Sequence, residues 1–250
     1  MDWSDRGIVL SARRHGESAA ILNLLTRDHG RHAGLVRGGA SRRLKGVLQP
    51  GNVVAAQWRG RLSEHLGSYT VELERSAPSA WLDDADRLGC LASACAVAEQ
   101  GLPERHPYEQ LYDGFEALLA ALESGHAYWQ AVYVRWELGL LDLLGFGLDL
   151  SACAVTGGND NLIYVSPRTG RAVSASAGEP YRDRLLTLPR FLIGGDTEGA
   201  VDVLAGLTLT GFFLERHLFA SEKSGIPPAR ERFVARLARA HTKSGVINGA

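Results

Sequence analysis

Long apolar runs are absent from this sequence of 250 residues. A membrane-spanning helix needs about 18 consecutive apolar residues without charge. The longest candidate, Val203 to Leu214, has 12 residues, including two Thr and two Gly, and predicts a buried helix. No positively charged segment followed by a long apolar core opens the sequence, so we expect no signal peptide. These absences predict a cytoplasmic protein without a membrane partner.

Cysteine pairs and catalytic motifs are also missing. The three cysteines, Cys90, Cys95 and Cys153, form no CxxC pair. This pattern is typical of a reducing compartment, in which thiols act as small core groups. The sequence has no GxGxxG, P-loop, GxSxG or HExxH motif. We therefore expect a protein that is not an enzyme, with no cofactor and no metal site.

Acidic residues are absent from His29 to Ser63, where seven basic residues occur. These residues are Arg31, Arg37, Arg42, Arg43, Lys45, Arg59 and Arg61. A stretch of one sign repels itself, which indicates an anionic ligand. Its glycines allow a close approach of the backbone to phosphates, so the stretch predicts nucleic-acid binding. A solvated loop is the alternative.

The predicted nucleic-acid-binding residues extend slightly beyond this stretch. The full set is Arg14, Arg31, Arg37, Arg42, Arg43, Lys45, Arg59 and Arg61. Trp58 and Tyr69 lie on neighbouring predicted strands and are candidates for stacking on bases. A small barrel also needs large core residues, so a core position for Trp58 is the alternative, and the sequence leaves the choice open.

Charge and periodicity divide the chain into two parts. Residues 1–80 hold 12 Lys/Arg and 7 Asp/Glu, whereas residues 81–250 hold 15 and 21. The N-terminal part predicts five short strands. One is expected at 7–15, two within 19–38 on either side of a hairpin turn at Asp28 to Arg31, one at 52–61 and one at 67–76. Closure of these strands into a barrel would remove their exposed edges. We therefore expect an α+β protein with domains at 1–79 and 80–250.

The back of the chain predicts a helical bundle. Its helices are expected at 81–102, 107–125, 127–147, 198–219 and 227–241. The helix at 127–147 is apolar nearly all round, which is typical of a central buried helix. Its single basic residue, Arg135, therefore calls for a nearby anion, with Glu99 or Glu215 as internal candidates. A Gly/Ser-rich insert at about 151–178 predicts a small β-hairpin with SPRTG as its turn.

Three segments follow one another in a specific order: VRGGASRRLKGVLQPGN after a hairpin, RWELGLLDLLGFGLDLSACAVTG, and YVSPRTGRAVS. Together they resemble the RecO family of bacterial DNA repair and recombination mediators. The resemblance runs from near Asp5 to the last helix, where IPPARERF is similar to the family's closing stretch. It implies an N-terminal OB-fold and a C-terminal helical domain, in agreement with the barrel and bundle.

The resemblance also implies a function and partners. Proteins of this family bind single- and double-stranded DNA, anneal complementary strands and, with RecR, help to load RecA onto DNA coated by the single-strand-binding protein SSB. The expected partners are therefore DNA, RecR and the C-terminal tail of SSB, with RecA indirectly and a location at the nucleoid. Arg135 is the candidate for the carboxylate of the tail, and Leu138, Leu141 and Leu144 are the candidates for its apolar tip.

The sequence departs from the family pattern in its insert. Many family members carry a four-cysteine zinc ribbon in the insert, but here Cys153, Thr156, Ser174 and Ala177 stand at those positions. One thiol cannot form a closed zinc site, so we expect a hairpin without zinc. The alternative is an RNA-binding OB-fold protein of the ribosome or of translation. Competition between matched DNA and RNA oligomers would distinguish the two functions.

Overall fold

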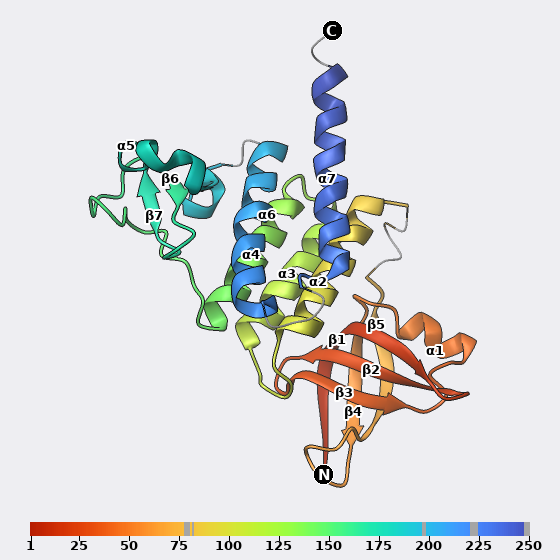
Figure 1. The fold of residues 1–250 in the computed structure, drawn as a ribbon. Helices are drawn as coiled ribbons and strands as arrows, with labels where there is room; N and C mark the ends of the chain where they lie inside the picture. Colours follow the sequence, from red (N-terminus) through yellow and green to blue (C-terminus); the bar gives the residue numbers. More distant parts are fainter. Residues whose placement is uncertain (78–80, 82, 197–198, 221–224, 248–250) are drawn as a thin grey trace. The chain divides into compact units, whose positions relative to one another are not determined.

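The computed structural model describes residues 1–77, 81, 83–196, 199–220 and 225–247 (Figure 1). The chain forms two compact units, Met1–Ser124 and Gly125–Ala250. The predicted domain boundary between residues 79 and 80 lies outside the described residues. Within the described ranges, no helix has the length and apolar character needed to span a membrane.

The first unit opens with a closed five-stranded barrel. Its strands pair in the order β1-β2-β3-β5-β4, and β4 returns to β1. Only β3 and β5 pair in parallel. The strands are β1 (Asp2–His15), β2 (Ala19–Thr26), β3 (Gly30–Val36), β4 (Val53–Arg59) and β5 (Ser68–Arg75). This order confirms the predicted OB-fold, a Greek-key barrel that pairs its edges with one another.

The hairpin between β2 and β3 lies where the sequence predicts it. Gly30 has a φ of +67°, a left-handed conformation that glycine adopts without steric cost. The Thr26 hydroxyl donates a hydrogen bond of 2.9 Å to the carbonyl of Gly30. The turn chemistry of the sequence therefore sets the register of the two strands.

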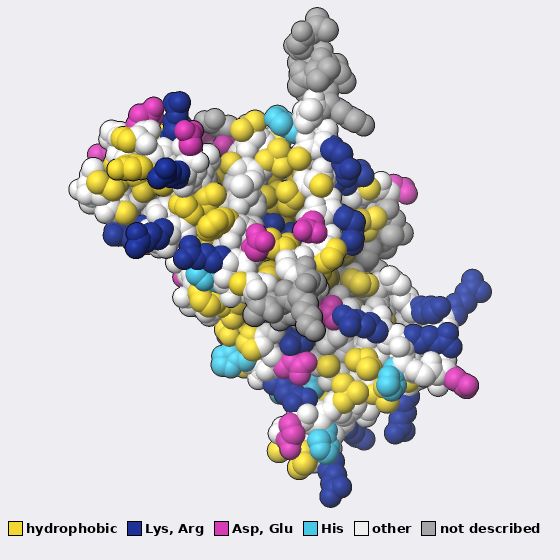
Figure 2. All heavy atoms as spheres, in the orientation of Figure 1, with side chains coloured by type: hydrophobic (Ala, Val, Ile, Leu, Met, Phe, Trp, Pro, Cys, Tyr) yellow, Lys and Arg dark blue, Asp and Glu magenta, His cyan; other side chains and the backbone are white. Residues whose placement is uncertain are grey.

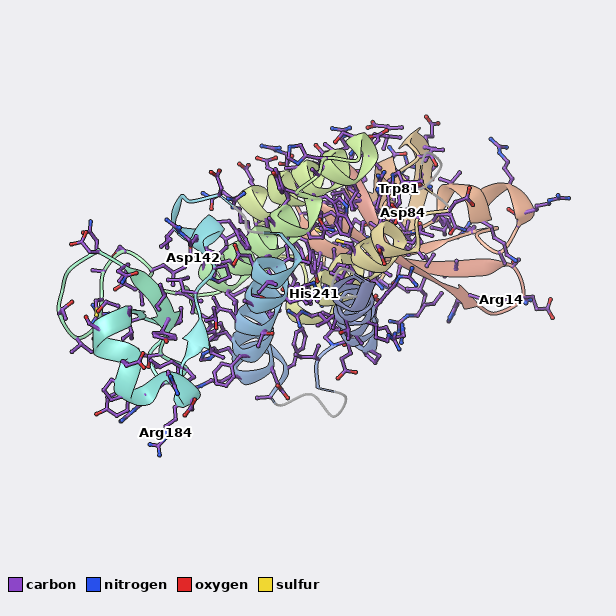
Figure 3. All side chains as sticks on the ribbon, turned by 90° about the horizontal axis from the view of Figure 1, so that it is seen from above. Arg14, Trp81, Asp84, Asp142, Arg184 and His241 are labelled. Atoms are coloured by element: carbon purple, nitrogen blue, oxygen red, sulfur yellow. The ribbon has the colours of Figure 1, made fainter. Side chains whose placement is uncertain are left out.

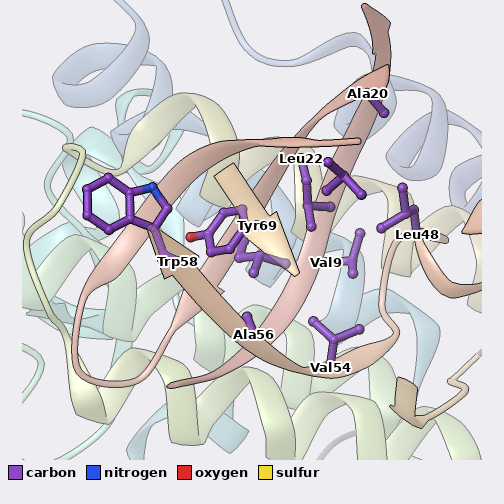
Figure 4. Close-up of a cluster of buried hydrophobic side chains, with 10 residues drawn as sticks. Val9, Ala20, Leu22, Leu48, Val54, Ala56, Trp58 and Tyr69 are labelled. Carbon is purple, nitrogen blue, oxygen red and sulfur yellow. The ribbon is translucent and has the colours of Figure 1, made fainter. Parts of the chain in front are cut away.

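Alternation along the strands fills the barrel. In β4, Val54, Ala56 and Trp58 are buried, while the residues between them are exposed. Figure 4 shows Trp58 and Tyr69 together with aliphatic side chains in this core. Trp58 is 1% exposed, and its Nε1 donates to the Leu66 carbonyl at 3.0 Å. The indole is therefore a core group and has no free face for stacking on a base.

The predicted basic loop contains a short helix, α1 (Arg42–Val47), which the sequence interpretation missed. Ser41 caps its N-terminus, with Oγ accepting from the Leu44 amide at 3.4 Å. Leu44 and Val47 pack on the barrel core, and Leu48 is buried there. This apolar spacing after a Ser cap is a helix signal, but the surrounding glycines favoured a loop.

Two helices complete the first unit, α2 (Ala85–Gly101) and α3 (Glu109–Ser124). Asp84 caps α2 by accepting hydrogen bonds from the amides of Asp86 and Arg87. The helix packs against β1, where Glu99 accepts from Ser11 and Arg13. Both helices were predicted, and the structure groups them with the barrel in one compact unit.

The second unit is built on α4 (Trp129–Leu143), α6 (Ala200–Leu214) and α7 (Pro228–Ile247). The predicted burial of α4 is confirmed: Tyr133, Val134, Leu140 and Leu141 are 0% exposed. A π-helical turn, η4 (Glu215–Phe219), extends α6. Helices α4 and α7 both contact α6.

A small sheet of three strands lies between α4 and α6 in the sequence. The predicted hairpin is formed by β6 (Leu162–Val165) and β7 (Ala172–Ser174), joined by the SPRTG turn. A short third strand, β8 (Leu186–Thr187), adds to β6 beyond the predicted insert. The connecting elements are α5 (Ala175–Gly178), η2 (Glu179–Arg184) and η3 (Arg190–Ile193).

Candidate nucleic-acid interface

Five arginines within residues 1–77 are paired with carboxylates. Their pairs are Arg6 with Glu74, Arg13 with Glu99, Arg27 with Asp113, Arg31 with Glu104 and Arg75 with Glu116. Arg31 belongs to the predicted nucleic-acid-binding set, but its side chain is only 16% exposed. Its Nε donates to the Leu102 carbonyl at 2.8 Å. The structure therefore places Arg31 in a contact with the segment after α2, apart from the other predicted residues.

Seven predicted residues have no carboxylate partner within the described ranges: Arg14, which donates to backbone carbonyls, and six others. The six others are Arg37, Arg42, Arg43, Lys45, Arg59 and Arg61, and all six are exposed. They lie on the end of β3, on α1, on β4 and in the loop after it. Figure 2 shows Lys and Arg side chains gathered where α1 covers the barrel. Unlike the five paired arginines, these six residues give the surface a positive charge that no carboxylate partner neutralises within the described ranges.

Three of these arginines line one groove of about 640 Å³. Arg37 comes from the end of β3, Arg43 from α1 and Arg59 from β4, so strand closure brings together residues up to 22 positions apart. Thr70 of β5 also lines the groove, and no Asp or Glu does. Sequence reasoning missed Thr70, because its place beside β3 depends on the parallel pairing of β3 with β5.

A neighbouring cavity of about 500 Å³ is lined by Arg14 and Lys45. Glu17 lines it as well, so this cavity is less cationic than the groove. Arg14 donates to the backbone carbonyls of Gly16 and Glu17 at the end of β1. Figure 3 shows Arg14 pointing outward from the barrel strands. Arg14 thus lies on the cationic surface, although its guanidinium is partly engaged by its own turn.

Two aromatic residues of the barrel, Trp58 and Tyr69, are buried, although Tyr69 forms part of the wall of the groove. Tyr69 is 4% exposed, and its hydroxyl lies 2.9 Å from Nδ1 of His32. Burial, together with the charge of Arg105, lowers the pKa of His32 to about 4, so the ring is neutral and shares a hydrogen bond with the Tyr69 hydroxyl. Without an exposed aromatic platform, the groove offers cations and hydroxyls, which suit phosphates rather than base faces.

The hairpin insert keeps the single thiol that the sequence predicts. Cys153 is buried, and its Sγ lies 3.5 Å from the Ser174 hydroxyl and accepts from the Ser174 amide at 3.3 Å. Burial alone would raise the pKa of the thiol, but hydrogen bonds from Ser174 and Thr156 outweigh it and lower the pKa to about 6. Across the described residues, no group of three or more His, Cys, Asp or Glu side chains is placed to hold a metal ion.

Arg135 does not lie in the buried position that the sequence predicts. Arg135 is exposed, so it does not require a buried anion. Its guanidinium donates to the Phe191 carbonyl at 2.8 Å and lies 5.5 Å from the Phe191 ring. Leu141 is 0% exposed, and Leu138 and Leu144 are half-buried, so the three leucines do not form one open groove.

The charge that is buried in α4 is Glu137. It is 0% exposed and forms an ion pair of 2.6 Å with Arg230 of α7, itself 4% exposed. Its signal in the sequence is a single Glu in an apolar helix, whereas the sequence interpretation singled out Arg135. Burial would lower the pKa of Arg230, yet the Glu137 carboxylate outweighs it and raises that pKa.

Comparison with known proteins covers nearly the whole chain. The profile described as Recombination protein O N terminal matches residues 1–77, and Recombination protein O C terminal matches residues 82–225. A protein of Rhodospirillum centenum named DNA repair protein RecO is 58% identical over 98% of both chains. Proteins of the same name from Rhodospirillum rubrum and Caulobacter vibrioides are 53% and 51% identical, over 96% of this chain and 97% and 99% of theirs. The chain therefore belongs to the recombination protein O (RecO) family.

Proposed function

We propose that this protein is a non-enzymatic recombination mediator that binds single- and double-stranded DNA and anneals complementary strands. With RecR, it would help to load RecA onto DNA coated by SSB. The observation that carries the proposal is the set of six exposed cations without carboxylate partners on β3, α1, β4 and the loop after it. The relatives named DNA repair protein RecO support it, and their name speaks against a role in translation.

The mechanism of annealing is electrostatic. Two DNA strands repel each other through their phosphates, and bound Arg and Lys side chains neutralise part of that charge. Because Trp58 and Tyr69 are buried, the groove would hold strands by their backbones and leave the bases free to pair. No nucleotide hydrolysis is needed for this step. Removal of SSB before RecA binds would require a partner protein such as RecR.

Salt dependence of binding tests the interface. Four contacts from Arg37, Arg42, Arg43 and Lys45 would give a slope of log K against log salt near −3 on single strands, at about −0.7 per contact. In Arg42→Ala/Arg43→Ala the slope should become less steep by about 1.4, for every sequence alike. The matched control is Arg13→Ala/Arg27→Ala, which removes two paired arginines. An unchanged slope in the first variant, or equal losses in both, contradicts the assignment.

Strand annealing tests the function itself. Complementary oligonucleotides, with and without SSB coating, should pair faster with the protein than without it, and slower with Arg42→Ala/Arg43→Ala. Matched DNA and RNA oligomers in competition decide the substrate class. Stronger retention of RNA, together with no acceleration of DNA pairing, would reject the mediator function.

The contact with SSB is proposed at Arg135. Its guanidinium is exposed and has a carbonyl and an aromatic ring as neighbours. It can therefore bind a terminal carboxylate without breaking an ion pair. Binding of a peptide with the acidic, apolar SSB tail should be lost in Arg135→Ala. It should persist in Arg184→Ala, another exposed arginine of the same unit, which Figure 3 shows pointing outward. Equal binding to both variants removes Arg135 from the proposal.

A further inference from the structure

A cavity between the barrel and α2 has a chemistry different from that of the cationic surface. Its volume is about 460 Å³, within the range of about 300–1,000 Å³ that is usual for small-molecule sites. Most of its wall is apolar, with Leu10 from β1 and Leu88, Leu91 and Ala96 from α2. Leu10 and Leu91 are buried, and the other two are half-buried. The cavity therefore offers apolar surface to a ligand.

The backbone holds this cavity in shape. The pairing of β1 with β2 shifts register between Val9 and Ser11, so Leu10 is an extra, bulged residue. A bulge re-aims a side chain, and here Leu10 lines the cavity, whereas Val9 lies in the barrel core. Pro50 on the rim is fixed by its neighbour Gly51, whose amide donates to the Val9 carbonyl at 2.8 Å. The cavity is therefore preformed.

The carboxylate of Glu99 is the charged group in the wall of this cavity. Its side chain is 13% exposed. Oε1 accepts three hydrogen bonds, from Ser11 at 2.7 Å, Arg13 at 2.9 Å and Asn23 at 3.1 Å. Across the described residues, Oε2 accepts none. A carboxylate oxygen in apolar surroundings favours a ligand with a hydrogen-bond donor, because an unpaired polar group there costs free energy.

The cavity also continues into the cationic surface. Gln49 and Pro50 line it, and they line the cavity of about 500 Å³ that contains Arg14 and Lys45 as well. A ligand that occupies both cavities must combine an apolar body, a hydrogen-bond donor and an anion. A nucleotide has these three parts: the face of the base, an amino group at its edge, and the phosphate.

We propose that the cavity between β1 and α2 receives one unstacked base of a bound DNA strand, with its amino group on Glu99 and its phosphate at Arg14 and Lys45. The inference deepens the proposed DNA-binding function and rests on it. An apolar side chain of a protein partner would fill the cavity but would leave the Glu99 oxygen unpaired, so a base fits better. The other bases of the strand stay free to pair.

This site predicts a preference among bases, which phosphate contacts alone do not give. Cytosine, adenine and guanine carry an exocyclic amino group, which a Glu side chain can accept. Thymine and uracil instead carry carbonyl oxygens on both sides of their ring N–H, and these oxygens repel a carboxylate. Strands rich in amino-bearing bases should therefore bind more tightly.

Two oligonucleotides of equal length, one of deoxycytidine and one of deoxyuridine, test this site in the full-length protein at neutral pH. Their backbones are alike, and their bases differ only at the edge that carries the amino group in cytosine. The deoxycytidine strand should bind about tenfold more tightly, the effect of one hydrogen bond to a charged group. Glu99→Gln should reverse the preference, because its amide donates to the uracil carbonyl.

A second variant, Ala92→Leu/Ala96→Leu, fills the cavity from α2 with residues that favour a helix. It should bind both strands equally, with an unchanged slope of log K against log salt. The matched control, Ala120→Leu/Ala121→Leu, adds the same side chains to one exposed and one half-buried position of α3. The control should keep the preference for deoxycytidine. Circular dichroism verifies that each variant is folded.

The outcomes separate this inference from the proposed function. Equal binding of both strands by the wild-type protein overturns the inference, and a salt slope that stays near −3 then leaves the proposed DNA binding intact. Failure of both strands to bind rejects the function and the inference together. Equal strand binding, with a leucine-rich amphipathic peptide that binds the wild-type protein but not Ala92→Leu/Ala96→Leu, assigns the cavity to a protein partner instead.

Discussion

The ion pair between Glu137 and Arg230 should control the stability of the second unit. The carboxylate accepts four hydrogen bonds: two from Arg230 at 2.6 and 2.8 Å, one from Tyr133 at 2.6 Å and one from Thr210 at 2.6 Å. Gly211 makes room for the guanidinium, since a Cβ there would lie 2.7 Å from it. The pair therefore connects α4, α6 and α7 at one buried point.

The perturbation is Arg230→Met, which keeps an apolar side chain of similar length. It removes two of the four hydrogen bonds and leaves the Glu137 charge buried without a counter-charge. Breaking a buried pair in this way costs about 3–5 kcal/mol. The reverse change, Glu137→Leu, leaves the Arg230 charge buried and should cost a similar amount.

The double variant Glu137→Leu/Arg230→Met should be far more stable than the sum of the single losses predicts. Both charges are gone, and replacing a whole buried pair by apolar groups is often neutral or stabilising. The double variant still loses about 1 kcal/mol of stability, because the Tyr133 hydroxyl no longer has the Glu137 carboxylate as its acceptor. The Thr210 hydroxyl can direct its single hydrogen to the Gly206 carbonyl, which lies 3.1 Å away.

Urea unfolding of the full chain, monitored by hydrogen exchange in α4, measures the decrease in the free energy of unfolding of each variant. Exchange in the barrel strands serves as the internal control and should be unchanged by all three variants. A loss below about 1 kcal/mol in Arg230→Met, or additive losses in the double variant, refutes the assignment of the pair as a buried structural contact.

Three further predictions follow from buried groups. Trp58→Ala should destabilise the barrel by about 3–5 kcal/mol in urea unfolding, and a fully stable variant with lost DNA binding would instead indicate a stacking role. Because the folded pKa of His32 is about 4 and the unfolded value about 6.5, the free energy of unfolding should fall as pH drops from about 6.5 to 4, by about 3 kcal/mol. His32→Gln should flatten that dependence, and an equal slope in both proteins contradicts it. Protein purified without chelator should contain well under one equivalent of zinc by elemental analysis, because the lone Cys153 has Ser174 and Thr156 beside it; stoichiometric zinc whose loss unfolds the hairpin contradicts this.

The sequence by itself predicted the five barrel strands and the long helices, in their order along the chain, but not α1 or β8. Period-two alternation and the turn at Gly30 predicted the strands, since local sterics and burial on one face act over a few residues. Apolar periodicity and cap residues predicted the long helices for the same local reason. The absence of acids from His29 to Ser63 likewise identified the cationic surface without any knowledge of its shape.

Tertiary structure decided which charges are free and which are paired. Arg31 and Arg59 lie in the same acid-free stretch, yet Arg31 meets Glu104 from 73 residues away, while Arg59 lines the groove. Arg135 and Glu137 are two residues apart, yet one is exposed and the other is bound to Arg230 of α7. A side chain's surroundings depend on which distant elements pack against its face, and local patterns carry no information about those partners.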